Sequence, residues 1–469
     1  MYDLIVIGSG PAGEKGAAQA AYFGSRVALI EREPVLGGAC VNTGTIPSKT
    51  LRESALHLSG FRQRGFRDAV EVTMKSISID DFMYRKQLVL EKEWQRIEEN
   101  LRRHEIDRYQ GNAKFLSPTQ IAVGDQVLEG KIILIATGSS PHRPSNVPFD
   151  DDCVCDSDTI LKIGRVPASL AVVGAGVIGC EYASIFAALG VEAHLVDARS
   201  SLLPHMDREI VRILLGEMQS RLGVILHLAC EVQTIEKRDG NVALTLRNGQ
   251  CINVETVLYA AGRSSNVADL NLDAAGVKTG NRGLVLVNDH YQTNVPNIYA
   301  AGDVIGFPAL ASTSMEQARV AIVHAFDLKY KTKVASLLPY AIYTIPELST
   351  VGMTEEECKN KGVPYEVGRA YYRNNARGQI IGDSKGLIKL IFHPETLKLH
   401  GVHIVGENAS ELLHIGMMVM QLDGTINAFI DSVFNFPTLS DAFKYAAYDG
   451  LGNVARAKTR KPKTAEERV

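Results

Sequence analysis

The residues best suited to chemistry are glycines that repeat the spacing G-x-G-x-x-G. This fingerprint occurs twice, with Gly8, Gly10 and Gly13 in the first copy and Gly174, Gly176 and Gly179 in the second. Such glycines allow a tight turn from strand to helix and let the backbone approach a pyrophosphate at the positive end of the helix. An acid about 20 residues further on, Glu31 or Asp197, can accept a hydrogen bond from a ribose hydroxyl. The pattern predicts two dinucleotide sites.

Two sites in one chain predict one dinucleotide that stays bound and one that exchanges. A flavin can hold a hydride pair between two half-reactions, so we expect FAD in one site and a nicotinamide dinucleotide, NAD or NADP, in the other. The expected chemistry is therefore oxidation and reduction by hydride transfer.

The elements that must position these glycines surround both fingerprints. In each copy, at residues 2–33 and 169–199, an apolar β-type run precedes the glycines, an alanine-rich helical segment follows them, and a second β-type run ends in the acid. This order predicts an α/β fold with two Rossmann-like domains. A charged amphipathic helix is expected from Tyr84 to Ile106. Its apolar stripe, typical of core packing, consists of Leu90, Trp94, Ile97 and Leu101.

Length, charge and cysteine content argue against several other classes. A chain of 469 residues exceeds one hydrophobic core and suggests two to four domains. A net charge of -3 gives no reason to expect nucleic acid or a membrane surface as partner, and no apolar run reaches the roughly 18 residues of a membrane span. The first β-type run begins almost at Met1, which leaves no space for a signal peptide. The seven cysteines lack metal-ligand spacing, as do His393, His403 and His414. We expect a reduced, cytoplasmic protein without a metal.

The segment GGACVNTGTIPSK, residues 37–49, resembles the flavin-proximal segment of the pyridine nucleotide–disulfide oxidoreductases, which include dihydrolipoamide dehydrogenase, glutathione reductase and mercuric reductase. Four further segments extend the resemblance over most of the chain: ATGSSP (136–141), AAGRSSN (260–266), NIYAAGDV (297–304) and FNFPTLSDAF (434–443). The resemblance implies FAD and NAD(P) domains and a C-terminal α+β dimerisation domain. It also implies a homodimer or a higher homo-oligomer, in which the C-terminal segment reaches the partner subunit's flavin site.

The departures from this family concern its thiol chemistry. The disulfide reductases carry two cysteines five positions apart, whereas this chain has Cys40 followed by Thr45. A hydroxyl cannot form a disulfide. The family's C-terminal histidine and glutamate are replaced by Phe436 and Asp441, and phenylalanine has no titratable proton. Because both halves of the thiol relay are missing, the sequence predicts a flavoprotein without a redox disulfide.

Within the family, the sequence most closely resembles the soluble pyridine nucleotide transhydrogenases (Si-specific). They share the C-x-x-x-G-T-I-P-S-K form and an aromatic residue ahead of the C-terminal Pro-Thr. Further matching segments are CDSD (155–158), GAGVIGCEYASIF (174–186), YTIPELSTVG (343–352) and YEVGRA (365–370). The resemblance implies an enzyme that passes hydride from NADPH to NAD+ through FAD, with one nicotinamide pocket used twice.

The resemblance also implies which residues form the sites. Lys49 and Glu181 are expected to pair beside the flavin, where the charge of Lys49 would favour the anionic reduced form. Cys40 and Thr45 complete the catalytic candidates, although a single buried thiol kept for packing is favoured for Cys40. The expected FAD contacts are Gly8, Gly10, Pro11, Gly13, Glu31, Arg32, Gly37, Gly38, Cys40, Lys49, Ala113, Thr137, Gly138, Asp303, Leu310 and Ala311. The expected NAD(P) contacts are Gly174, Gly176, Ile178, Gly179, Glu181, Asp197, Ala198, Arg199 and Gly262.

Discrimination between the two nicotinamide dinucleotides is expected at residues 197–199. Asp197 can accept from the 2′-hydroxyl of NAD, and Arg199 could pair with the 2′-phosphate of NADP. A solvent-facing Arg199 without such a role is nearly as plausible. The combination is compatible with use of both dinucleotides.

The expected domain order follows the repeat and the resemblance. The FAD domain would comprise residues 1–146 and 267–338, interrupted by the NAD(P) domain at 147–266. Residues 339–455 would form the dimerisation domain, and 456–469 a charged, solvated tail.

Two other functions remain open from the sequence. The missing dithiol fits an NAD(P)H-dependent diaphorase that reduces a quinone, a dye or a metal ion equally well. A non-catalytic flavoprotein subunit is the third reading, and the intact glycines, Lys49 and Asp303 argue against it.

Overall fold

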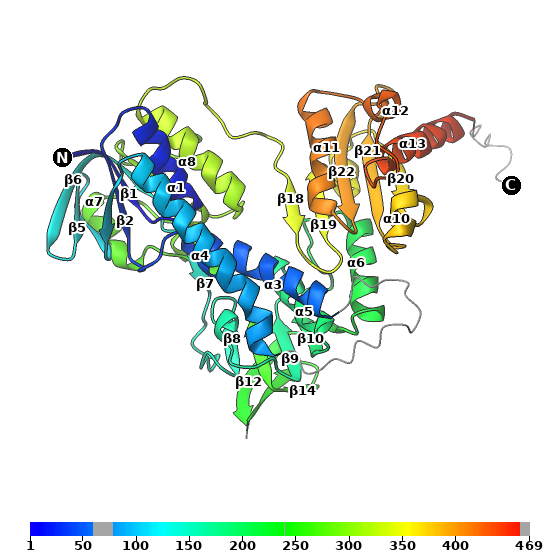
Figure 1. Ribbon diagram of the computed structural model, residues 1–469, viewed down its shortest axis with the longest axis horizontal. Coiled ribbons are helices and arrows are strands. Elements are labelled where there is room, and N and C mark those ends of the chain that lie inside the picture. The colour runs from blue at the N-terminus through cyan, green and yellow to red at the C-terminus, as the bar shows by residue number, and fades with distance from the viewer. Residues whose placement is uncertain (60–77, 239, 460–469) are drawn as a thin grey trace.

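The computed structural model describes residues 1–59, 78–238 and 240–459 of the chain. Figure 1 shows three groups of elements: the N-terminal sheet with its helices, a second sheet below it, and a C-terminal sheet beside them. The chain leaves the first sheet after its sixth strand, builds the second sheet, and later returns to add one more strand to the first. The second sheet is therefore inserted into the first domain.

The first sheet is mainly parallel, and its central strands β1 and β2 are buried on both faces. Its strands are β1 (Tyr2–Ile7), β2 (Val27–Glu31), β3 (Asp107–Gln110), β4 (Ala113–Ser117), β5 (Gln120–Val123), β6 (Gln126–Ile135) and β17 (Ile298–Ala300). The order is β3-β2-β1-β6-β5-β4, with β17 parallel to β6 and the hairpin β4–β5 antiparallel. Helices α1 (Pro11–Tyr22) and α8 (Ala311–Ala325) lie side by side against this sheet (Figure 1). Burial on both faces explains why β1 and β2 read as continuous apolar runs.

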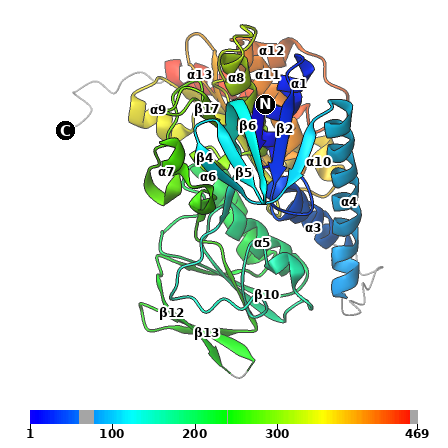
Figure 2. The same ribbon diagram turned by 90° about the vertical axis from the view of Figure 1, so that its left-hand side faces the viewer.

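The second sheet repeats this design with five parallel strands. They are β8 (Val154–Asp156), β9 (Ser169–Val173), β10 (Glu192–Asp197), β11 (Ile225–Leu228) and β15 (Thr256–Tyr259), in the order β11-β10-β9-β15-β8. Its helices are α5 (Val177–Ala188) and α6 (Arg208–Ser220). An antiparallel sheet extends from it at the bottom of Figure 2, formed by β12 (Val232–Arg238), β13 (Asn241–Leu246) and β14 (Cys251–Val254). A short ribbon of β7 (Ser139–Pro141) and β16 (Arg263–Ser265) joins the chain where it enters and leaves this domain.

The C-terminal sheet is antiparallel and has helices packed on it. Its strands are β18 (Tyr340–Ile342), β19 (Leu348–Gly352), β20 (Glu366–Tyr371), β21 (Leu387–Phe392) and β22 (Leu399–Val405), in the order β18-β19-β22-β21-β20. The helices of this part are α9 (Glu355–Lys361), α10 (Ala376–Ile380), α11 (Ala409–Gln421), α12 (Asn427–Asp431) and α13 (Ala442–Thr459). Helix α11 packs on β19 and β22, and α13 packs on β20 and β21. We call residues 339–459 the interface domain.

Three helices connect the domains near the first fingerprint. They are α2 (Gly38–Asn42), α3 (Thr45–Leu58) and α4 (Ile79–Arg103). The smaller elements are α7 (Leu272–Ala275) and the 3₁₀ turns η1 (Ile160–Lys162), η2 (Ala268–Leu270), η3 (Asn281–Gly283), η4 (Asp303–Ile305) and η5 (Tyr372–Asn374). Helix α3 packs against both α4 and α5, so it links the first domain to the second.

The expected fold class is confirmed, but two expected boundaries differ. Helix α4 begins at Ile79, five residues before the predicted Tyr84, because the Ser78 hydroxyl caps it by accepting from the Asp81 N–H at 3.1 Å. Its stripe residues Leu90, Ile97 and Leu101 are buried, as predicted from the pattern. Helix α4 ends at Arg103, three residues before the predicted Ile106. Residues 456–459, where a solvated tail was expected, are exposed and form the end of α13. The rest of that tail lies outside the described residues.

Candidate dinucleotide and redox site

The first glycine fingerprint forms the turn between β1 and α1. A Cβ added at Gly13 would lie 1.8 Å from the Gly8 carbonyl oxygen, so only glycine allows the helix to approach the strand this closely. At Gly10, in contrast, an added Cβ would meet no protein atom closer than 3.9 Å. Within the described residues, no contact requires glycine at this position. The position instead fits a turn that leaves space for a pyrophosphate at the N-terminus of α1, which begins with Pro11.

The acid that closes the first copy, Glu31, lies at the end of β2 beside this turn. Its Oε2 accepts from the Ser9 N–H at 2.9 Å and from the Ser9 hydroxyl at 2.6 Å, and its Oε1 accepts from the Glu33 N–H at 3.0 Å. Among the described ion pairs none involves Glu31. Arg32, predicted as a cofactor contact, pairs with Glu33 instead, with 3.2 Å between Nε and Oε1.

The remaining predicted FAD contacts come from separate parts of the chain. The Thr137 hydroxyl, after β6, is buried without a hydrogen-bond partner. Asp303, at the start of η4, accepts from the Ser139 hydroxyl at 2.8 Å. Leu310 is the N-cap of α8, and Ala311 is its first residue. A buried hydroxyl without a partner and an open glycine turn both fit a bound polar cofactor, so these residues suit FAD.

The other predicted FAD contacts are three glycines and an alanine. Gly37 and Gly38 begin α2 next to the first turn, and an added Cβ at Gly38 would lie 2.8 Å from the Gly10 Cα. Gly138 has a positive φ of 68°. Ala113 is buried at the start of β4. The close approach of Gly38 to Gly10 brings the segment 37–49, with Cys40 and Lys49, against the first glycine turn.

Lys49 and Glu181 form an ion pair between two domains, as the resemblance implied. Lys49, on α3, donates to both carboxylate oxygens of Glu181, on α5, at 2.9 and 2.8 Å. The Glu181 side chain is 3% exposed and that of Lys49 is 26% exposed. A buried carboxylate thus holds a lysine that remains accessible from one side.

Tyr343 is a residue of this site to which the sequence analysis gave no role. It follows β18 of the interface domain, and its backbone N–H donates to Glu181 Oε1 at 2.9 Å. Its ring centroid lies 5.1 Å from the Lys49 Nζ, which is a cation–π contact. All three domains therefore meet at one ion pair. The segment YTIPELSTVG contains this tyrosine, but its spacing alone gives no sign of the contact.

Cys40, on α2, has a hydroxyl rather than a second thiol beside it. Burial raises the pKa of the Cys40 thiol, and a hydrogen bond with Thr45 and the charge of Lys49 offset this only in part. All seven cysteines lie in the described residues, and all are free thiols. A protonated, unpaired thiol is a poor nucleophile.

The second fingerprint lines a cavity of about 770 Å³. It brings together most of the predicted NAD(P) contacts, namely Gly174, Gly176, Ile178, Asp197, Ala198, Arg199 and Gly262. Gly179 packs against the first glycine of its turn, since an added Cβ would lie 1.7 Å from the Gly174 oxygen. Glu181 does not line this cavity and instead holds Lys49. At Gly176 an added Cβ would meet nothing within 4 Å, so this turn too leaves space for a pyrophosphate.

Asp197 and Arg199 contact each other at the end of β10. Arg199 donates through Nε and Nη2 to the two oxygens of Asp197, at 2.9 and 2.7 Å. Burial opposes ionisation of Asp197, but hydrogen bonds from Arg199 and from the Ala175 N–H lower its pKa below the ordinary value. The Arg199 side chain is also 48% exposed, so it faces solvent while it holds Asp197.

The C-terminal segment 434–443, which the resemblance assigns to a partner subunit, is exposed only in part, because Leu439, Ala442 and Phe443 are buried. Phe436 is 75% exposed, and Val433, just before the segment, is 95% exposed. Such apolar side chains are usually covered when a partner is present.

In the described part of the chain no group of three or more His, Cys, Asp and Glu side chains could hold a metal ion. Among residues 1–59, 78–238 and 240–459, every helix is too short or too polar to cross a membrane.

Comparisons with known proteins agree with this geometry. Residues 2–325 match the family described as pyridine nucleotide-disulphide oxidoreductase, and residues 338–447 match its dimerisation domain. The chain is 47% identical to a soluble pyridine nucleotide transhydrogenase of Mycobacterium bovis, covering 97% of this chain and 98% of the relative. It is 41% identical to the protein of that name from a Marinomonas species, over 97% and 99% of the two chains.

Solved structures show the same fold. The Cu(II) complex of the HOCl-induced flavoprotein disulfide reductase RclA from Escherichia coli aligns with a TM-score of 0.85 at 27% identity, covering 95% of this chain and 99% of that one. LpdA from Mycobacterium tuberculosis aligns with a TM-score of 0.86 at 25% identity, over 95% and 99%. The expected use of FAD and NAD(P) agrees with these families. The chain therefore is an oxidoreductase of the pyridine nucleotide-disulphide oxidoreductase family, within the group of the soluble pyridine nucleotide transhydrogenases.

Proposed function

We propose that this protein transfers hydride from NADPH to NAD+, using one nicotinamide site twice and no redox disulfide. The observation that carries the absence of a redox disulfide is the contact of Cys40 with Thr45, since the half-buried thiol has a hydroxyl where a dithiol enzyme needs a second sulfur. The names of the relatives at 40–47% identity support the same reaction.

The residues of the first turn would hold FAD. Its pyrophosphate would take the space beside Gly10, its ribose would meet Glu31, and the buried Thr137 hydroxyl would gain a partner. Bound there, FAD would supply a ring that takes up a hydride from one nicotinamide and gives it to another. The protein residues have only to hold and orient the reactants, because the two nicotinamides have nearly equal potentials.

Lys49 would hold a positive charge at the flavin. Its ammonium is fixed by Glu181 and by the Tyr343 ring, and the buried carboxylate prevents it from turning into solvent. A preorganised charge of this kind favours a reactant that gains negative charge. The ion pair would also fix the second domain against the first, because Lys49 lies on α3 and Glu181 on α5.

Under this proposal a second subunit completes the flavin site. The exposed segment with Val433 and Phe436 would cover the flavin site of a partner subunit in a homodimer. Phe436 cannot exchange protons, so its contribution would be to exclude water from the flavin.

The test is reduction of thio-NAD+ by NADPH with the purified yellow protein, beside reduction of a quinone by NADH. Rapid formation of thio-NADH would support transhydrogenation. A protein that reduced only the quinone would be a diaphorase, and the proposal would be wrong. Failure to take up FAD would reject both and leave a non-catalytic role.

A further inference from the structure

A second cavity, of about 600 Å³, lies where helix α6 of the second domain meets the interface domain. Figure 1 shows α6 beneath the C-terminal sheet, and the helix contacts β19 and β22 of that sheet. The cavity is lined by one face of α6 and, on the opposite side, by Tyr371, Arg373 and Lys385. It shares no lining residue with the cavity of the second fingerprint. We call it the junction cavity, and its size is that of a small-molecule site.

The cations of the junction cavity have no carboxylate partner. Arg212, Arg373 and Lys385 are exposed, and no described ion pair includes any of them. Glu217 is the one acid among the described lining residues, and it lies 3.8 Å from Arg221 on its own helix. The lining therefore presents three positive charges that the described chain leaves uncompensated.

The donor groups of the two arginines are open to a ligand. Arg212 donates through Nε to the Arg208 carbonyl oxygen at 3.3 Å, and no described hydrogen bond uses its Nη groups. The Arg373 guanidinium lies 4.1 Å from the centroid of the Tyr371 ring. Stacking on a ring uses the face of a guanidinium, so the N–H groups at its edge stay available. Two such forks beside an ammonium group suit phosphate oxygens.

The other end of the same junction is closed by protein carboxylates. Arg369, two residues before Tyr371, donates to both oxygens of Glu209 at 2.8 and 2.9 Å. Glu209 lies in the first turn of α6, and Arg212 and Ile213 follow it on the same helix face. Along this face the protein thus supplies both charges at the first turn and, beyond it, only the positive ones.

Gly216 keeps the helix side of the junction cavity open. It lies in the interior of α6, where glycine stabilises a helix less than alanine does. An added Cβ would meet no described atom within 4 Å, so no contact in the described chain requires glycine there. The position leaves space for a group that the described chain does not supply.

We propose that the junction cavity binds a small anion that carries two or more phosphate groups. Three separate cations attract an anion of several charges more strongly than an anion of one. The anion is held by Arg212 on α6 and by Arg373 and Lys385 of the interface domain, so it stabilises the packing of the two domains. This site goes beyond the proposed function and does not rest on it, since binding requires no hydride transfer.

The test is titration calorimetry of pyrophosphate into the FAD-loaded protein, with saturating NAD+ present to fill the cavity of the second fingerprint. Pyrophosphate should bind at least about tenfold more tightly than inorganic phosphate. It should also raise the Tm, because it binds the folded protein. ADP in the same titration identifies the source of the diphosphate. Tighter binding than pyrophosphate assigns the site to a nucleotide and weaker binding to an inorganic diphosphate, and both results retain the site.

Two variants remove the site in different ways. Arg373→Gln/Lys385→Gln removes two of the three cations and should weaken pyrophosphate binding about tenfold or more. Gly216→Leu keeps every charge but fills the cavity, and it should weaken binding as much. Leucine favours a helix over glycine, so unfolding would not explain that loss. Lys329→Gln is the matched control, since it breaks an exposed pair with Asp327 outside the cavity and should bind pyrophosphate as the wild type does.

Three results would overturn the proposal. The first is no binding of pyrophosphate, or binding that neither variant weakens. The second is equal weakening in Lys329→Gln, because the effect would then reflect net charge alone. The third is loss of binding in the charge variant but not in Gly216→Leu, which would place the anion outside the cavity. Pyrophosphate binding at this site without thio-NAD+ reduction would retain the site and reject the transhydrogenase, and thio-NAD+ reduction without pyrophosphate binding would do the reverse.

Discussion

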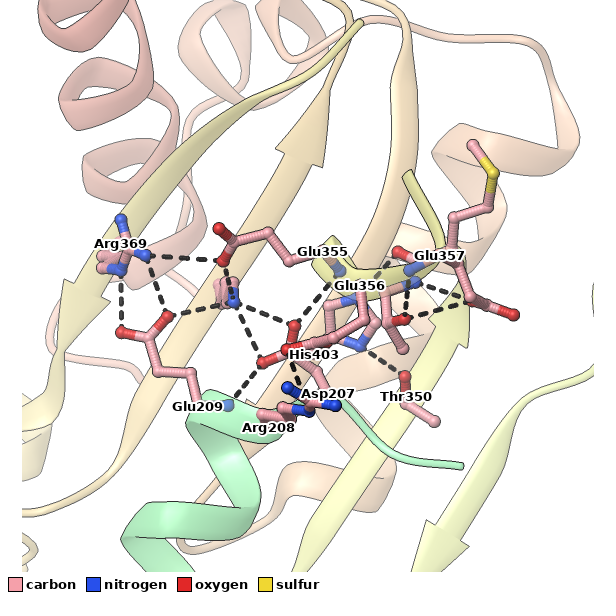
Figure 3. A network of polar contacts seen from close by, with 12 residues as sticks. Asp207, Arg208, Glu209, Thr350, Glu355, Glu356, Glu357, Arg369 and His403 are labelled. Atoms are coloured by element: carbon pink, nitrogen blue, oxygen red, sulfur yellow. Dashed lines mark hydrogen bonds and ion pairs between the residues drawn. The ribbon is translucent and has the colours of Figure 1, made fainter. Parts of the chain in front are cut away.

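The ammonium of Lys389 lies 2.9 Å from Asp207 Oδ2, and these side chains are only 1% and 0% exposed. Asp207 is the N-cap of α6 in the second domain, and Lys389 belongs to β21 of the interface domain. Lys389 also contacts Glu209 at 3.0 Å and Glu355 at 2.7 Å. Figure 3 shows these carboxylates turned toward a common centre, with Arg369 at its edge. This ion network joins the nicotinamide-binding domain to the interface domain.

Replacing Lys389 with methionine should strongly destabilise the protein. The variant would leave the buried Asp207 without its cation, and breaking a buried pair in this way costs about 3–5 kcal/mol. The midpoint of urea unfolding of the FAD-loaded protein measures the change. Lys398→Met is the matched control, since it breaks an exposed pair with Asp423 and should shift the midpoint little. Equal shifts would show that the network contributes no more than a surface pair.

The same network should make the protein sensitive to acid. Burial opposes ionisation of Asp207 and Glu209, but His403 and Lys389 lower the pKa of Asp207, and Arg369 and Lys389 lower that of Glu209, below the ordinary value. A carboxyl with a lowered pKa stabilises the folded state above its unfolded pKa of about 4, and this contribution is lost as pH falls through the folded pKa. Urea midpoints should therefore drop below about pH 4. In Lys389→Met the drop should be smaller, and an unchanged drop would exclude Lys389 as its cause.

Loss of Lys49 should slow flavin reduction while FAD stays bound. Lys49→Met removes the charge that Glu181 holds at the site, and removing one preorganised electrostatic contact costs on the order of 100-fold in rate. Stopped-flow absorbance with NADPH measures the rate, and gel filtration measures retained FAD. Lys131→Met, which breaks an exposed pair with Asp3, should match the wild type in both. A wild-type reduction rate in Lys49→Met would disprove the role of this lysine.

The Tyr343 ring should contribute through Lys49. Tyr343→Leu keeps the N–H that binds Glu181 but removes the cation–π contact, which is worth about 0.5–2 kcal/mol, or roughly a 2- to 30-fold loss in the rate of flavin reduction. Tyr343→Phe keeps the ring and should retain most of the rate. If the Phe and Leu variants were equally slow, the hydroxyl rather than the ring would be responsible.

Cys40 should be dispensable for turnover. Its thiol is held protonated by burial and has no second sulfur to pair with, so Cys40→Ala should retain thio-NAD+ reduction within about twofold. Thr45→Ala reports separately on the hydroxyl that contacts this thiol. Near-complete loss of activity in Cys40→Ala would mean that the thiol takes part in the reaction.

The sequence alone predicted the fold class and the two glycine turns between strand and helix. The reason is physical, since the spacing of Gly8, Gly10 and Gly13 reflects a local backbone requirement that no distant residue can supply. The sequence also placed Asp197 and Arg199 at one site, because they are two residues apart at the end of one strand. The missing dithiol was also visible, because it depends on the identity of residue 45.

The tertiary structure decided which distant side chains meet. Tyr343 is separated from Glu181 by 162 positions, and Lys389 from Asp207 by 182, so no periodicity or spacing links them. The sequence likewise marked Asp197 and Arg199 as alternative ribose contacts but not as partners of each other. Whether a charge is free or compensated depends on side-chain direction and burial, and only the packed domains fix these.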